Sequence, residues 1–80
     1  MHPPEGMEDA IRLNLIGFLC PIPVHETRRV LETCEPGQFL EVICDDPETL
    51  HDIPALCDRI DAKLVSVKEN SGEFTFVISA

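Results

Sequence analysis

Two prolines, Pro21 and Pro23, constrain the fold of this chain most strongly, because they fix where a helix can begin. Proline has no backbone N–H and fits a helix without loss only in its first turn. The residues that follow repeat at helical spacing, and the predicted apolar face consists of Val24, Thr27, Leu31 and Cys34. A helix therefore begins just after Cys20, which lies at or next to its N-cap.

The segment before this helix has the pattern of a half-buried strand. Apolar residues from Ala10 to Leu15 alternate with Arg12 and Asn14, which is the period of a strand with one covered face. Gly17 then ends the strand as a turn glycine. We expect a strand, a short loop and a helix in this order.

The second part of the chain repeats this order. The turn Pro36-Gly37 ends the first helix, and Gln38 to Cys44 is a nearly continuous apolar run, typical of a strand between two neighbours. Asp46 is expected to cap a second helix, with Pro47 at its first position. Its predicted apolar face consists of Leu50, Ile53, Cys57 and Ile60.

Pro54 lies inside this second helical pattern. It predicts either a kink or a short turn followed by a new helix start, and the pattern does not decide between them.

The last predicted element of the chain is a β-hairpin. Residues 63–69 and 73–79 have strand character around the turn Asn70-Ser71-Gly72. The element order β-α-β-α-β-β predicts an α+β fold, a two-layer α/β sandwich. Each helix has one apolar face, so both should cover the same face of a four-stranded mixed sheet. The two β-α-β crossovers should be right-handed and their strands parallel, and the hairpin adds an antiparallel strand.

Charge and length limit the classes of function. Eighty residues make one domain, and we expect residues 10–80 to form it after a disordered leader, residues 1–9. The net charge of −9 disfavours direct nucleic-acid binding and anionic membrane surfaces, and it favours basic protein partners. No segment approaches the roughly 18 apolar residues of a membrane span, and no secretion signal is evident. We therefore expect a cytoplasmic protein. A monomer is expected as well, although the sequence leaves the oligomeric state open.

Cys20 differs from the other three cysteines. Cys34 and Cys57 lie on apolar helix faces and Cys44 ends a strand, so we interpret them as packing residues. Cys20 ends a loop before a helix, whose N-terminal dipole is expected to lower the pKa of the thiol and make the sulfur nucleophilic. The spacing of the cysteines indicates neither a zinc site nor a redox pair.

Two further groups near this loop have both a structural and a functional interpretation. Asp45 and Asp46 stand where a strand ends and a helix begins, so they either shape the Cys20 site or, as we prefer for Asp46, cap the helix. His25, one turn beyond Cys20, is interpreted as a solvated residue, with proton relay as the alternative. His2 and His51 complete no metal site, and we predict none.

The run from Leu13 to Pro23, with Cys20-Pro21-Ile22-Pro23 after a strand and a glycine, resembles the signature of the TusA/SirA family. A second matching block contains Asp45-Asp46-Pro47, then Asp52-Ile53-Pro54 and Cys57. The resemblance extends from about Arg12 to Ile78. It implies one TusA-like domain over residues 10–80, with a fold that resembles the C-terminal domain of bacterial translation initiation factor three.

The resemblance also implies sulfur relay without a cofactor. Cys20 would be the catalytic cysteine, a persulfide carrier rather than a stand-alone turnover enzyme, and Gly17, Pro21, Pro23, Asp45 and Asp46 would be the supporting motif residues. The implied donor is a cysteine desulfurase or a rhodanese-like protein, and the implied acceptor is a protein with a reactive cysteine. The pathway stays open among tRNA thiolation, cofactor synthesis and sulfur oxidation.

Three positions depart from the family pattern. Asn14 stands where Asp is frequent, Leu19 where Arg is frequent before the cysteine, and Ile22 at a variable position that is often acidic. The loss of a cation beside Cys20 makes its activation depend more on the helix terminus, and partner choice is expected to differ. Two other functions remain open: a binding or regulatory module of the same fold, and a thiol-disulfide redox protein, against which the lack of a nearby resolving cysteine counts.

Overall fold

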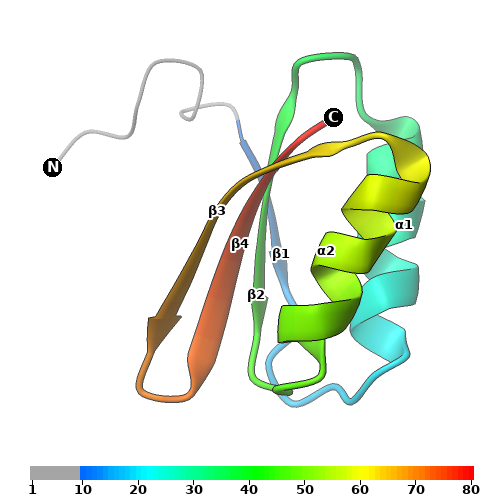
Figure 1. Ribbon diagram of the computed structural model, residues 1–80. Coiled ribbons are helices and arrows are strands. Elements are labelled where there is room, and N and C mark those ends of the chain that lie inside the picture. Colours follow the sequence, from blue (N-terminus) through cyan, green and yellow to red (C-terminus); the bar gives the residue numbers. More distant parts are fainter. Residues whose placement is uncertain (1–9) are drawn as a thin grey trace, which may run out of the picture.

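The computed structural model describes residues 10–80, and the expected leader, residues 1–9, lies outside them. Four strands and two helices follow one another in the predicted order β-α-β-α-β-β. Their bounds are β1 Ile11–Asn14, α1 Ile22–Thr33, β2 Phe39–Cys44, α2 Thr49–Ile60, β3 Lys63–Asn70 and β4 Glu73–Ser79. Both helices lie on one face of the sheet, which confirms the two-layer α+β sandwich (Figure 1).

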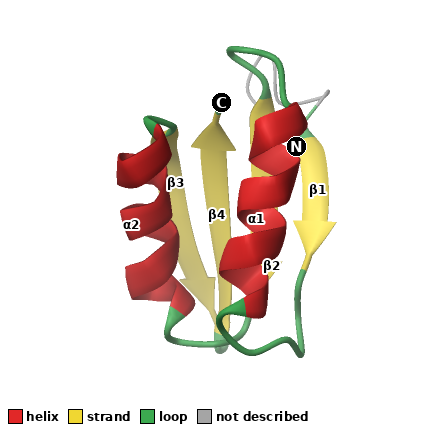
Figure 2. Ribbon diagram, turned by 90° about the vertical axis from the view of Figure 1, so that its right-hand side faces the viewer, coloured by secondary structure: helices red, strands yellow, loops and turns green. Residues whose placement is uncertain are grey.

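The sheet has the strand order β1-β2-β4-β3. β1 and β2 pair in parallel, and β4 pairs antiparallel with both β2 and β3. The last strand along the chain therefore lies between the two strands of the second crossover (Figure 2). The hairpin that delivers it turns through Ser71 and Gly72, both with positive φ, as the tight two-residue turns of hairpins require.

The core lies between the sheet and the helices. β2 and β4 contribute alternate residues to it, and the fully buried ones are Leu40, Val42, Cys44, Phe76 and Ile78. This alternation is the strand period with one face turned to the helices. Neither helix of residues 10–80 lies on the opposite face of the sheet (Figure 1).

The first helix begins where the prolines predict. Its N-cap is Pro21, joined to Cys20 by a cis peptide bond, and Pro23, Thr27 and Leu31 are its buried residues. Cys20 thus lies one residue before the N-cap, within the predicted position.

The second helix decides one open alternative and corrects two predictions. It runs without interruption through Pro54, which excludes the turn followed by a new helix start. Its N-cap is Glu48, because Asp46 and Pro47 belong to the turn that precedes it. Leu50, placed on the apolar face by its spacing, is 40% exposed, while Leu56 is buried. The buried side chains of α2 are Thr49, Ile53, Leu56 and Cys57, and at 3.6 residues per turn Leu56 lies within this stripe while Leu50 lies at its margin. Neither helix among residues 10–80 is long and apolar enough to cross a membrane.

Candidate functional site

Two loops meet at one edge of the sheet. β1 and β2 are parallel and in register, with Asn14 opposite Ile43, and the Leu15 N–H donates to the Ile43 carbonyl at 2.8 Å. Parallel strands end at the same edge, so the loop after β1 and the connection after β2 lie together (Figure 1). Residues 15–21 and residues 45–48 therefore share this edge, although nearly 30 positions separate them in sequence.

Two carboxylates hold the β1–α1 loop. Asp45 Oδ1 accepts the Gly17 N–H at 3.0 Å, and Asp46 Oδ2 accepts the Cys20 N–H at 2.8 Å. Gly17 has φ of +90°, a conformation that residues with a side chain rarely adopt. The structure thus brings together four of the residues singled out in the sequence: Gly17, Cys20, Asp45 and Asp46.

Asp46 contacts the Cys20 loop, as considered, and it holds the turn before α2 instead of capping the helix. Its Oδ1 accepts the Glu48 N–H at 3.0 Å in the turn before α2, while its Oδ2 accepts the Cys20 N–H. These two N–H donors, first that of Cys20 and then that of Glu48, hold the pKa of the Asp46 carboxyl below its usual range. Asp46 is therefore ionised at neutral pH and links the start of α2 to the Cys20 loop.

The predicted lowering of the Cys20 pKa is wrong. Burial raises the pKa of Cys20 to about 12, and the negative charge of Asp46 and hydrogen bonding to Asp52 act in the same direction. Removing a thiol from water and placing carboxylates beside it both disfavour the thiolate. The thiol is consequently protonated in the free protein at neutral pH.

The start of α1 also explains why the helix dipole does not lower the pKa of Cys20. Pro21 and Pro23 have no N–H, and the Ile22 N–H donates to the Leu19 carbonyl at 3.0 Å. The residues that define the helix start therefore remove most of the donors through which a helix terminus stabilises an anion. Asp52, the second carboxylate beside the sulfur, comes from α2 and was not among the residues predicted from the sequence.

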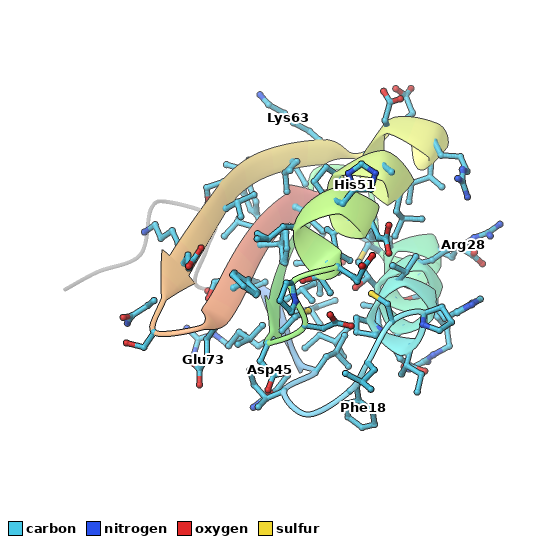
Figure 3. All side chains as sticks on the ribbon, turned by 60° about the horizontal axis from the view of Figure 1, so that its bottom comes forward. Phe18, Arg28, Asp45, His51, Lys63 and Glu73 are labelled. Carbon is cyan, nitrogen blue, oxygen red and sulfur yellow. The ribbon has the colours of Figure 1, made fainter. Side chains whose placement is uncertain are left out.

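Apolar side chains surround the Cys20 loop. Four of them form what we call the apolar collar: Ile16 (36% exposed), Phe18 (46%), Leu19 (70%) and Ile22 (46%). Phe18 projects outward from the loop near Asp45 (Figure 3). The departures at Leu19 and Ile22 were visible in the sequence, but the contribution of Ile16 and Phe18 was not.

Asn14, the third departure from the family pattern, accepts the Ile16 N–H through Oδ1 at 3.0 Å. This bond needs only an oxygen at this position.

The other three cysteines are packed. Cys44 and Cys57 are buried, and burial raises the pKa of Cys44 to about 11. Cys34 is half-buried at the end of α1, and its thiol donates to the Val30 carbonyl at 3.3 Å. All four cysteines are free. Residues 10–80 hold no group of three side chains placed to bind a metal ion, and His2 lies outside them.

Comparison with known proteins agrees with this architecture. Residues 11–80 match the protein family described as sulfurtransferase TusA. The fold is similar to that of a SirA-like protein from Desulfitobacterium hafniense, with a TM-score of 0.76 and 21% sequence identity, over 88% of this chain and 96% of the other.

Proposed function

Since the chain belongs to the TusA sulfurtransferase family, we propose that it carries sulfur as a persulfide on Cys20 and passes it to a cysteine of another protein. The observation that supports this most directly is the anchoring of the Cys20 backbone by Asp46 at 2.8 Å. A carrier must offer one sulfur at a defined place on its surface, and this bond fixes the residue that bears it. Cys20 is also the one cysteine bordered by exposed apolar side chains.

The loading step needs no cofactor. The Cys20 thiol gives its proton to a neighbouring carboxylate, Asp46 or Asp52, as its sulfur attacks the outer sulfur of a donor persulfide. A new S–S bond forms on Cys20, the donor S–S bond breaks, and the donor thiolate takes up a proton. Release reverses the roles: an acceptor thiolate attacks the outer sulfur and Cys20 leaves as thiolate. Sulfane sulfur is exchanged and no net oxidation occurs.

The raised pKa of Cys20 makes this activity conditional on a partner. A protonated thiol reacts slowly with small electrophiles, because the thiolate is the nucleophile. A cationic group brought by a partner would neutralise Asp46 and Asp52 and favour the thiolate. Docking against the apolar collar would exclude water from the two sulfurs. We therefore expect fast transfer within a protein complex and slow reaction outside it.

Within this proposal the donor is a cysteine desulfurase or a rhodanese-like protein, and the acceptor is a protein with a reactive cysteine. Gly17, Pro21, Pro23, Asp45 and Asp46 position the loop. Sulfur supply to tRNA thiolation, cofactor synthesis or sulfur oxidation in the cytoplasm is compatible with the same chemistry.

The test is intact-protein mass spectrometry after incubation with a cysteine desulfurase and cysteine. Wild type should gain the mass of one sulfur atom and lose it on addition of a reductant, and Cys20→Ser should gain none. Cys34→Ser is the matched control, because Cys34 is half-buried at the other end of the same helix; it should load like wild type. Loading retained in Cys20→Ser would show that another cysteine is the carrier.

A binding or regulatory module of the same fold is the second hypothesis, and the protonated state of Cys20 in the free protein favours it. Under this hypothesis, neither a desulfurase nor a rhodanese would load the wild type. Cys20→Ser would then bind its partner as tightly as wild type does.

A further inference from the structure

A groove runs between the two helices, which lie side by side on the sheet (Figure 2). It has a volume of about 160 Å³ and is lined by Pro21, Val24, Asp52, Ala55, Leu56 and Arg59. Its apolar residues come from both helices, and its two charged residues both come from α2.

The groove begins at the candidate sulfur site. Pro21, which lines it, follows Cys20 directly, and Asp52, which also lines it, interacts with the Cys20 thiol. A chain segment that lies in the groove therefore has one end close to Cys20.

The two charged residues mark the ends of the groove. Asp52 and Arg59 are seven residues apart on α2, which places them on one face at a separation of about 10.5 Å along the axis. The ion pairs of residues 10–80 join Arg12 to Glu41, Arg28 to Glu32 and Arg29 to Glu26, so Arg59 takes part in none. The groove thus has an acidic end beside the sulfur, an apolar middle and a basic end with an unpaired guanidinium.

We propose that this groove binds an extended segment of the partner protein, next to the partner cysteine that exchanges sulfur with Cys20. The segment carries a basic, an apolar and an acidic residue at alternate positions, which meet Asp52, the apolar middle and Arg59 in turn. Alternate residues of an extended segment point to one side, and four residues span about 13 Å. This span is longer than the separation of Asp52 and Arg59 along α2, and the long Arg59 side chain reaches across the difference.

This inference rests on the proposed carrier function for its biological meaning, but its binding step is testable alone. The basic residue of the segment would neutralise Asp52, which adds to the effects of burial and Asp46 in raising the pKa of Cys20. The contact that recognises the partner would therefore also favour the thiolate. The transfer itself stays balanced: the outer sulfur of the Cys20 persulfide moves to the partner thiolate, and Cys20 is left as thiolate.

The experiment is a titration of the ¹⁵N-labelled full chain, not loaded with sulfur, with two peptides of equal composition. In Ser-Lys-Ser-Leu-Ser-Glu the first serine replaces the reacting cysteine, and in Ser-Glu-Ser-Leu-Ser-Lys the two charges are exchanged. We expect amide shifts at Val24, Ala55 and Arg59, and about three- to fivefold tighter binding of the first peptide, the size of an exposed ion pair. Arg59→Glu should abolish this preference.

Arg28→Glu is the matched control, because Arg28 projects from α1 outside the groove (Figure 3) and the substitution changes the net charge equally. It should keep the preference for the first peptide. Equal affinities of the two peptides for wild type, or equal effects of the two substitutions, would overturn the groove proposal. Because the titration involves no sulfur, failure of the carrier function would show only in the mass measurement on Cys20→Ser.

Discussion

Cys20 and Cys34 lie at opposite ends of α1, and the groups that surround the two thiols differ. Both thiols are free and half-buried, one just before the N-cap and the other at the C-cap. The thiol of Cys34 meets the carbonyl of its own helix, and Leu31, Pro36 and Ile60 line a pocket with it. The thiol of Cys20 meets carboxylates from another element, Asp46 and Asp52.

Exposure alone therefore does not distinguish a candidate sulfur site from a packed cysteine. Burial raises the pKa of both thiols, but only at Cys20 do ionised side chains add to the effect. Charges that a partner is able to neutralise make a thiol switchable, whereas burial among apolar groups does not. We expect the contrast between the two ends to appear in reactivity, in stability and in pH dependence.

The largest effect is expected from removing the carboxylates beside Cys20. In the double variant Asp46→Asn and Asp52→Asn, the pKa of Cys20 should fall from about 12 part of the way to 9.0, because burial still acts. This fall in pKa should raise the alkylation rate at pH 8 several-fold, since the gain in thiolate exceeds the loss of intrinsic nucleophilicity. The measurement is the rate of iodoacetamide labelling of each cysteine by peptide mass spectrometry. Cys34 is the internal control and should keep its rate; equal acceleration of both cysteines would instead indicate general loosening of the fold.

A smaller effect is expected from a matched pair of glycines, one at each end. Gly17 and Gly37 have φ of +90° and +86°, and an added Cβ would meet no atom within 4 Å at either position. Alanine at each should lower the free energy of unfolding by about 1 to 2 kcal/mol, from backbone conformation alone. Urea denaturation measures this loss. Only Gly17→Ala should also slow sulfur loading, because Gly17 donates to Asp45 in the Cys20 loop; slower loading in Gly37→Ala would contradict this division.

The smallest effect is expected in the contribution of Asp46 to the stability of the fold at acidic pH. Its folded pKa lies below the ordinary value of 3.8, so the ionised carboxylate stabilises the fold at neutral pH. This stabilisation is lost as the pH falls below 3.8 and through the lower folded value, because in this range the unfolded state binds more protons than the folded state does. Urea midpoints at pH 6 and pH 3 should therefore differ less in Asp46→Asn than in wild type. Asp61→Asn, an equal change of charge at the Cys34 end, is the control, and an unchanged difference in Asp46→Asn would refute the assignment.

Local patterns predicted the elements because their causes are local. Pro21 and Pro23 place the start of α1, and the period of two places the strands. The position of β4 between β2 and β3 was not predicted, because alternation tells which face of a strand is covered but not which strand lies beside it. The exposure of Leu50 was missed because helical spacing gives a stripe of neighbouring residues, whereas packing against the sheet decides which side of that stripe is buried.

In the candidate site, too, local features were predicted and long-range contacts were not. The sequence singles out Cys20 through the prolines that follow it, and it places two aspartates at the next strand end. It left open whether Asp46 shapes the Cys20 site, and it did not reveal that Asp52 approaches the thiol, since these contacts span 26 residues and more. The wrong sign of the pKa shift followed from this, because the effect of the helix dipole was considered without the carboxylates from another element.

The central place of β4 has a consequence for synthesis on the ribosome. A nascent chain that has emerged only as far as Asn70 contains β2 and β3 but lacks the strand that joins them. Its sheet edge and the apolar residues of β2 stay open until residues 73–79 leave the exit tunnel. We expect this domain to fold only after β4 has emerged, in one step, and we expect its surface charge to limit aggregation until then.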